Sequence, residues 1–297
     1  MSFHSGFVSI IGRPNVGKST LLNRLCGEKV AIVAAKPQTT RGAIRAIYND
    51  DARQIVFVDT PGLHSARNKL GGLMNAAAES ALADCDACVY VAPPKSPSRE
   101  DRTALSRLGR VKCPVFFVMN KMDTIVGDKL AVAGKAAEEY GKLYNFSEYF
   151  YISALKGERL SDLFDAVKAA MPPGPKYYPD DLITDQSERS VVAELIREQA
   201  LRLLSEEVPH GIAVEITAQK PRADRRLIDI EATIFIEKKS HKGIVIGKHG
   251  AMLKEIGVRS RPGIERFLGS PVALGLWVKV KEGWRDSDYL LREFGFR

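Results

Sequence analysis

The sequence predicts an α/β protein, a P-loop doubly wound sheet followed by a smaller α+β domain. Strand-like apolar runs alternate with helix-like segments up to about residue 170, an order typical of doubly wound sheets. Four prolines then fall within nine residues, Met171–Pro179, which neither a helix nor a central strand accommodates. We therefore expect a first domain over residues 1–171, a Pro-rich linker over 172–180 and a second domain over 181–297.

The composition is that of an ordinary globular protein. The chain has 297 residues, of which 45% are hydrophobic and 27% are charged, so two domains with sizeable cores are expected. It contains no apolar run long enough to span a membrane, and too few residues precede the first strand for a secretory signal, so we expect a cytoplasmic location. Cys85 and Cys88 form a C-x-x-C, for which we favour the entrance of a buried strand over a metal or redox function.

The first predicted strand, Phe7–Ile11, leads into Gly12–Ser19, which has the form of a phosphate-binding loop. Its glycines allow backbone N–H groups to surround a phosphate chain, and the next helix, Thr20–Cys26, points its N-terminus at that chain. The Lys18 amine can reach the terminal phosphates, and the Ser19 hydroxyl can bind Mg²⁺. The alternative is a tight turn without a ligand. The expected binding residues here are Asn15, Val16, Gly17, Lys18, Ser19 and Thr20.

A polar stretch follows that resembles a switch loop. The segment Val30–Ala43 lacks periodicity and contains the run Lys36–Arg41. Two strands, Ala43–Asn49 and Gln54–Val58, then form a predicted hairpin. Asp59 ends the second of them, and a carboxylate at the carboxyl end of such a strand can hold the hydration shell of Mg²⁺.

The rest of the first domain continues the alternation of strands and helices. Ligands of doubly wound sheets bind at the carboxyl edge of the strands, so we expect Asn120–Asp123 and Ser153–Lys156, which follow two of these strands, at the same site as the phosphate loop. The expected helices are Asn68–Ala83, Arg99–Arg110, Lys129–Tyr144 and Leu160–Ala170, and the strands are Ala87–Val91, Val115–Met119 and Tyr149–Ile152.

The second domain has a basic centre. Between Lys238 and Arg266 the chain carries eight basic and two acidic residues. Within this stretch, Gly247-Lys248-His249-Gly250 lies between two helical segments, where glycines allow a nucleic-acid backbone to approach and Lys248 and His249 can donate to phosphates. A plain connecting turn is the alternative. The expected elements are helix Glu188–Leu204, strands Ile212–Ala218 and Leu227–Glu237, a basic helix, helix Ala251–Ile256 and strand Val272–Val280.

Five motifs in order resemble those of the translation-factor-like GTPases: the phosphate loop, the switch threonine, Asp59–Gly62, Asn120–Asp123 and Ser153–Ala154. The resemblance implies that Asp123, as a buried carboxylate, accepts hydrogen bonds from guanine that adenine cannot donate. It also implies that Asn120 braces the base and the loop, Lys121 covers the ring and the Ala154 N–H meets the guanine carbonyl beside Ser153.

The same resemblance assigns the switch and the chemistry. Thr40, with Thr39 as the alternative, would complete a Mg²⁺ site with Ser19 and Asp59, and Gly62 would sense the third phosphate. We therefore expect Lys18, Thr40 and Gly62 to act in GTP hydrolysis. Ras-like proteins have a water-orienting glutamine after this glycine, but this chain has Leu63, so slow intrinsic hydrolysis is expected. Asn15 either holds K⁺ beside the phosphates or stabilises the loop.

The second half resembles a KH domain of type II, which clamps about four unpaired nucleotides. The residues implied to bind RNA are Gly247, Lys248, His249, Gly250, Lys242, Lys238, Lys239 and Arg259, the last three also fitting a merely solvated helix face.

Both halves together resemble the bacterial GTPases of small-ribosomal-subunit assembly within the TrmE-Era-EngA-like class. Further similarities are Pro37–Arg41, Tyr178–Asp185 and Leu276–Lys281. The resemblance implies a monomer that binds the 3′ end of 16S rRNA and the 30S subunit, with GTP or GDP and Mg²⁺ as cofactors. It also implies peripheral association with the inner face of the cell membrane. The alternatives are a GTPase component of tRNA modification and an RNA-binding scaffold whose nucleotide site is only structural.

Overall fold

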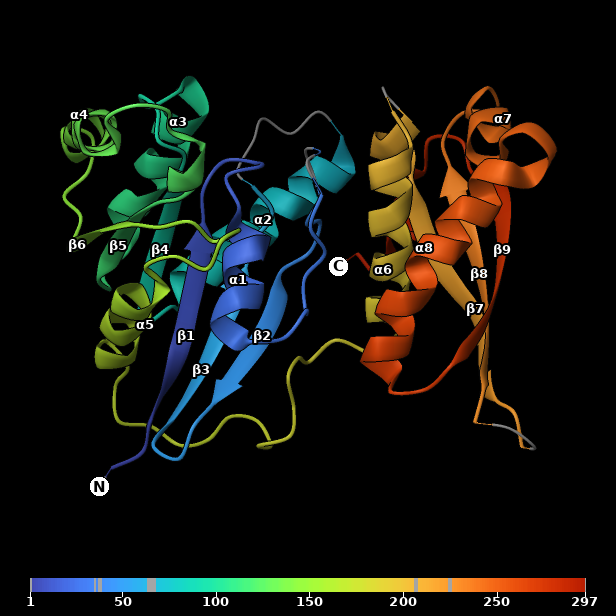
Figure 1. Cartoon of the computed structure of the whole chain (residues 1–297), viewed down its shortest axis with the longest axis horizontal. Helices are drawn as coiled ribbons and strands as arrows, with labels where there is room; N and C mark the ends of the chain where they lie inside the picture. Colours follow the sequence, from blue (N-terminus) through green and yellow to red (C-terminus); the bar gives the residue numbers. More distant parts are fainter. Residues whose placement is uncertain are drawn as a thin grey trace. The chain divides into compact units, whose positions relative to one another are not determined.

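The computed structural model describes residues 2–34, 36, 39–62, 68–205, 208–223 and 226–296. By its internal contacts the chain divides into two compact units, each with its own sheet and core (Figure 1). Both units are discontinuous in sequence. The first comprises Met1–Ala31, Thr40–Arg67 and Gly71–Asp185, and the second comprises Ile32–Thr39, Asn68–Leu70 and Gln186–Arg297.

The first unit is a doubly wound sheet of six strands in the order β2-β3-β1-β4-β5-β6. All strand pairs are parallel except β2 with β3. Helices α1 and α5 pack on one face and α2, α3 and α4 on the other, so the central strands are apolar along their length (Figure 1). The elements are β1 (His4–Ile11), α1 (Lys18–Cys26), β2 (Ile44–Asn49), β3 (Arg53–Asp59), α2 (Lys69–Ala83), β4 (Ala87–Ala92), α3 (Arg99–Arg107), β5 (Val115–Met119), α4 (Lys129–Gly141), β6 (Glu148–Tyr151) and α5 (Leu160–Ala169).

The second unit is a smaller α+β fold around a three-stranded sheet, β7-β8-β9. Strand β8 pairs antiparallel with β7 and parallel with β9, which is an edge strand. Helices α6 and α8 contact each other and contribute to one apolar core with the sheet. The elements are α6 (Glu188–Leu203), β7 (Ala213–Pro221), β8 (Ile228–Ile236), α7 (His241–Ile246), α8 (Ala251–Leu268), β9 (Val272–Val280) and α9 (Asp288–Glu293).

Most of the expected elements are confirmed, and the main differences lie in helices. Helix α8 continues to Leu268, although the sequence predicted its end near Ile256; Pro262 lies inside it. Helix α4 ends at Gly141, before the predicted Tyr144, and the short helix α9 was not expected at all. Within the described ranges, no helix combines the length and the apolar character that crossing a bilayer requires.

The Pro-rich segment after α5 lies along the first sheet. Gln54 on β3 accepts hydrogen bonds from the backbone of Tyr177 and Tyr178, at 2.6 and 2.9 Å, and Ile47 on β2 donates to the Ile183 carbonyl at 3.0 Å. The chain up to Asp185 therefore packs with the first unit. The domain limits at residues 171 and 180 stay a prediction.

Candidate functional sites

The phosphate-binding loop follows β1 and has a backbone that only glycine can adopt at two positions. Gly12 and Gly17 have φ angles of 146° and 102°. A Cβ atom at Gly12 would lie 2.3 Å from the Val91 carbonyl oxygen, and one at Gly17 would lie 2.3 Å from Nδ2 of Asn120. Any larger residue would therefore push the loop away from β4 and from the asparagine behind it.

Lys18 lies at the first residue of α1, with its amine turned back into the loop. Its Nζ donates to the carbonyls of Gly12 and Arg13 at 3.0 and 3.1 Å, and the side chain is only 6% exposed. The amine therefore lies within the curl of the loop, where the resemblance expects it to meet phosphates. A phosphate oxygen could replace the two carbonyls as acceptors.

Ser19, Thr40 and Asp59 converge on one point. Ser19 Oγ donates to Asp59 Oδ2 at 2.5 Å, Thr40 Oγ1 donates to the same oxygen at 3.0 Å, and the two hydroxyls are 2.9 Å apart. The other carboxylate oxygen, Asp59 Oδ1, is buried and has no hydrogen-bond partner among the described residues. Hard oxygen donors around an unsatisfied carboxylate suit Mg²⁺, so the predicted metal residues fit that ion.

Burial shifts both charged groups toward their neutral forms. It raises the pKa of the Asp59 carboxyl, opposed by the Lys18 charge and the hydrogen bonds from Ser19 and Thr40. It lowers the pKa of the Lys18 amine, opposed in turn by Asp59. A phosphate and a cation would each supply the countercharge that these buried groups lack.

The two threonines of the first switch have different surroundings. Thr39 Oγ1 donates to the carbonyls of Ala34 and Lys36, at 3.2 and 2.6 Å, and lies outside the oxygen cluster. Thr40 is the residue that reaches Asp59, which favours the first of the two alternatives. Gly62 packs against the phosphate loop, since a Cβ atom there would lie 2.8 Å from the nitrogen of Pro14. The prediction on Leu63 falls outside the described residues.

Asn120 joins the phosphate loop to the loop after β6. Its Nδ2 donates to the Val16 carbonyl at 2.9 Å, and its Oδ1 accepts the Ala154 N–H at 2.9 Å, with the side chain 2% exposed. The bracing role expected of Asn120 thus has direct contacts. The N–H expected to meet guanine is donated to Asn120 instead, so that predicted role of Ala154 has no support from these contacts.

Asp123 is half-buried, whereas the resemblance implied a buried carboxylate. It lies on a short 3₁₀ turn after β5 rather than within the sheet, which leaves one side open to solvent. Ser153 Oγ donates to its Oδ1 at 2.6 Å and so fixes its orientation. Lys121 has a φ of 67°, and its Nζ donates to the Asn15 carbonyl at 2.5 Å. The Asn120–Asp123 motif therefore contacts the phosphate loop at a second point, in addition to the bond from Asn120.

In the second unit, the Gly247–Gly250 loop connects α7 to α8. Gly247 and Gly250 have φ angles of 74° and 79°, and His249 has 52°. A Cβ atom at Gly247 would lie 2.7 Å from the backbone nitrogen of Met252, so this position requires glycine. Lys248 and His249 are exposed at the tip, where both can meet a phosphate backbone.

The basic residues around this loop are exposed, and two of them have acidic neighbours. Lys239 lies 3.7 Å from Glu282, and Arg259 lies 2.6 Å from Glu255. Lys238 and Lys242 are exposed as well. Two large apolar side chains are exposed on the helices that flank the loop, Ile244 on α7 at 49% and Val258 on α8 at 51%. The surface thus offers both charge and apolar contact.

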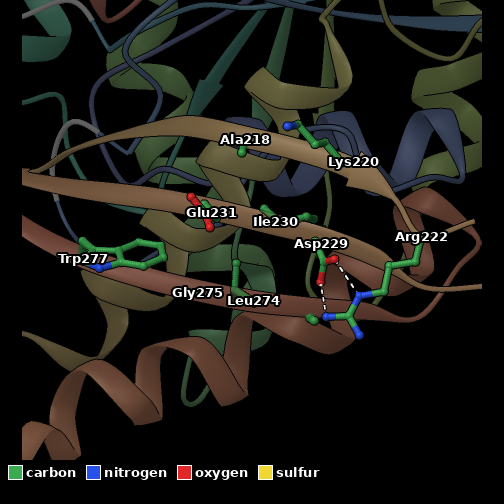
Figure 2. Close-up of a pocket in the computed structure, with 10 residues that line it drawn as sticks. Ala218, Lys220, Arg222, Asp229, Ile230, Glu231, Leu274, Gly275 and Trp277 are labelled. Carbon is green, nitrogen blue, oxygen red and sulfur yellow. Dashed lines mark hydrogen bonds and ion pairs between the residues drawn. The ribbon is translucent and has the colours of Figure 1, made fainter.

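The outer face of the second sheet carries a pocket of about 590 Å³, which was not expected from the sequence. Trp277 on β9 forms one wall and is 48% exposed, because Gly275 leaves room for its indole on the strand; a Cβ there would lie 2.8 Å from the ring. Arg222 and Asp229 close the opposite end as a bidentate pair at 2.6 and 2.7 Å (Figure 2). Lys220, Ala218 and Glu231 also line it.

The segment Ile32–Thr39, which precedes the switch threonine, belongs to the second unit. The Val33 N–H donates to Glu198 on α6 at 3.1 Å, and the Val33 carbonyl accepts from Arg202 at 2.9 Å. Glu198 is fully buried, and Arg197 is 2% exposed and donates to the Thr39 carbonyl. Glu198 and Arg197 were missed because a charged residue on an amphipathic helix normally faces solvent.

Comparison with known proteins identifies the family of this chain. Residues 7–121 match the 50S ribosome-binding GTPase family and residues 207–285 match the KH domain. GTPase Era of Clostridium kluyveri is 51% identical over 294 residues, covering 99% of both chains. The chain belongs to the Era family of GTPases. GTPase Era of Carboxydothermus hydrogenoformans is 47% identical over the whole chain and 99% of its own length.

Two solved Era structures match with a TM-score of 0.94 at 37% identity over 99% of both chains. One is Era in complex with MgGDPNP and nucleotides 1506–1542 of 16S ribosomal RNA, and the other is an Aquifex aeolicus Era variant bound to GDP·AlF4⁻. The Era family membership confirms the expected fold class, a P-loop GTPase unit followed by a KH unit, and the GTPase activity. It leaves no support for the tRNA-modification alternative.

Proposed function

We propose that this Era-family GTPase binds the single-stranded 3′ end of 16S rRNA through its Gly247–Gly250 loop and assists assembly of the 30S subunit. The observation that carries the proposal is the glycine-dependent loop between α7 and α8, with Lys248 and His249 exposed at its tip. A related Era is known in complex with a 16S rRNA segment. Phosphates would contact the loop, and bases would lie against Ile244 and Val258.

In the nucleotide site, each residue would have a role that follows from its position. Lys18 would turn from the loop carbonyls to the terminal phosphates, and Asn120 would hold the phosphate loop against the base-binding turn. Ser19, Thr40 and Asp59 would hold Mg²⁺, which when bound neutralises phosphate charge. Asp123, oriented by Ser153, would accept the guanine N–H groups that adenine lacks.

We propose that K⁺ accelerates hydrolysis through Asn15. Asn15 is exposed at the tip of the phosphate loop with a φ of 64°, so its side chain is directed by an unusual backbone rather than by core packing. Leu63 cannot orient an attacking water, which leaves a role for a cation beside the phosphates. GTP hydrolysis should be faster in K⁺ than in Na⁺, and Asn15→Ala should remove that difference; equal rates in both salts for the parent protein would contradict the proposal.

The coupling between nucleotide and RNA would run through the switch segment Ile32–Thr39. Thr40 bonds to Asp59 in the metal cluster, while its neighbour Thr39 is held by Arg197 of α6. Rearrangement of Thr40 on loss of the third phosphate would therefore pull on a helix of the RNA-binding unit. Fluorescence anisotropy of a labelled 3′-end 16S oligonucleotide should show tighter binding with a GTP analogue than with GDP.

The RNA site itself is tested by charge reversal at its tip. The double change Lys248→Glu and His249→Glu should weaken binding of the oligonucleotide more than tenfold and reduce its salt dependence. The control is Lys135→Glu, an exposed lysine of the first unit that lies in neither proposed site. Equal loss in both variants would mean that general charge, rather than the loop, binds RNA.

A second candidate is an RNA-binding scaffold with a structural nucleotide site. Lys18→Ala separates the two, because it removes the phosphate contact but leaves the second unit unchanged. A GTP switch predicts that RNA binding becomes insensitive to added nucleotide and that assembly activity is lost, whereas the scaffold predicts unchanged activity.

We also propose that the protein acts as a monomer in the cytoplasm and associates peripherally with the inner face of the cell membrane. Only the family resemblance supports the membrane part. Co-sedimentation with anionic vesicles, and light scattering in solution, test the two statements separately.

A further inference from the structure

Two cysteine thiols meet at the edge of the first sheet opposite the nucleotide site. Cys85 precedes β4 and Cys113 precedes β5, and these strands are parallel neighbours, with Cys88 paired to Val115. Their amino ends must therefore lie side by side. The Sγ atoms of Cys85 and Cys113 are 3.4 Å apart, and both residues are half-buried.

Backbone hydrogen bonds hold both loops in place. Asp86 and Phe7 bond reciprocally, with the Asp86 N–H donating to the Phe7 carbonyl and the Phe7 N–H donating to the Asp86 carboxylate, each at 2.8 Å. On the other side, the Cys88 N–H donates to the Pro114 carbonyl at 3.0 Å. Neighbouring residues of both cysteines are thus anchored, and the thiols stay in contact without any change of fold.

We propose that Cys85 and Cys113 form a reversible disulfide when the protein meets a peroxide. The Cys85 sulfur attacks one peroxide oxygen, the O–O bond breaks, and one water leaves as Cys85 becomes a sulfenic acid. The Cys113 sulfur then attacks the Cys85 sulfur and displaces the hydroxyl as a second water. Two thiols and one hydrogen peroxide give one disulfide and two waters.

The surroundings assign the order of attack. The hydrogen bond with Cys113 lowers the pKa of the Cys85 thiol and raises that of Cys113, so Cys85 is the one of the two that loses its proton more readily. The Ser9 hydroxyl acts in the same direction, whereas burial and the Asp86 carboxylate oppose it. A thiolate is the reactive form of cysteine, which makes Cys85 the attacking group and Cys113 the resolving one.

The other two cysteines do not take part. Cys88, the partner that the C-x-x-C pattern suggests, is fully buried within β4, and burial raises the pKa of its thiol. Cys26 lies on α1 at the opposite face of the sheet, where burial raises its pKa to about 12. Among the described residues, no group of His, Cys, Asp and Glu side chains could hold a metal, so the thiol pair is not part of such a site.

The experiment treats the full-length protein with near-stoichiometric hydrogen peroxide, alkylates free thiols after unfolding, and digests without reduction. A protease that cleaves before aspartate separates Cys85 from Cys88, because Asp86 lies between them. We expect a cross-linked peptide pair containing Cys85 and Cys113, two hydrogen atoms lighter than its parts, with Cys26 and Cys88 alkylated. Dithiothreitol added after the peroxide and before the alkylation should restore all four thiols.

Three variants test the roles. Cys113→Ser should accumulate a Cys85 sulfenic acid that dimedone traps, Cys85→Ser should slow peroxide consumption at least about tenfold, and the control Cys26→Ser should form the disulfide at the parent rate. A cross-link of Cys85 to Cys88, or four free thiols after peroxide treatment of the parent protein, would overturn the proposal. The proposed RNA function is unaffected by either result, because these thiols contact neither site.

Discussion

Asn120 offers the sharpest test of how the nucleotide site is held together. It is 2% exposed and makes two hydrogen bonds of 2.9 Å, one to the Val16 carbonyl in the phosphate loop and one from the Ala154 N–H. In Asn120→Ala both backbone groups lose their partner at a buried position. The variant therefore measures what this connection contributes to the first unit.

The magnitude follows from these two contacts. A buried polar group left without a partner costs about 1–3 kcal/mol, so the loss of two partners should lower the free energy of unfolding of the first unit by about 2–6 kcal/mol. For a unit of this size, each kcal/mol shifts the melting temperature by about 2–4 °C, so a decrease of roughly 4–24 °C is expected without nucleotide. Nucleotide affinity should fall too, because the loop loses its brace.

Calorimetry of the full-length protein measures this decrease. Trp277 and Trp284 both lie in the second unit, so tryptophan fluorescence follows that unit separately. The matched control is Asn145→Ala, an exposed asparagine whose loss should change stability by less than about 0.5 kcal/mol. If Asn120→Ala and Asn145→Ala melt at the same temperature, the reasoning from buried hydrogen bonds is refuted.

Three further outcomes are expected. Gly247→Ala should destabilise the second unit by about 1–3 kcal/mol in urea unfolding, whereas Gly243→Ala, which has open space around it, should be neutral or stabilising; equal effects would contradict the positive-φ argument. Acrylamide should quench the emission of Trp277, which is 48% exposed, but not that of Trp284, which is fully buried, so Trp277→Phe should leave only emission that resists quenching. Alkylation needs the thiolate, so Cys26, with its pKa of about 12, should resist iodoacetamide at pH 8 and become reactive as the pH rises; rapid labelling at pH 8 would show an unshifted thiol.

The nucleotide site could be predicted because its motifs are local. The phosphate loop, Asp59 and Asn120–Asp123 each follow a strand, and the topology of a parallel sheet gathers strand ends at one edge. The choice of Thr40 over Thr39 could not be made in this way, because it depends on which hydroxyl the switch turns toward Asp59. The half-buried state of Asp123 likewise depends on a 3₁₀ turn that its motif does not specify.

Other features could not be predicted from the sequence, because they depend on packing. The sequence predicted an end of α8 near Ile256, yet the helix continues through Pro262, and Ile256 and Ile264 on either side of this proline are buried in the core. The partner of Cys85 could not be found from spacing, because Cys113 reaches it only through the pairing of β4 with β5. The two cysteines are far apart in the sequence, and the sheet places them side by side.

The membership of Ile32–Thr39 in the second unit has a consequence for how this protein can be dissected. A fragment that begins at residue 186 would contain α6 but lack the segment whose backbone bonds to Glu198 and Arg197, and both of these side chains are buried. Such a fragment would expose these two charged side chains, which are buried in the full-length protein. No single cut of the chain yields both units intact. The RNA-binding unit therefore cannot be transferred on its own, and a gene fusion or a truncation must include the switch segment Ile32–Thr39.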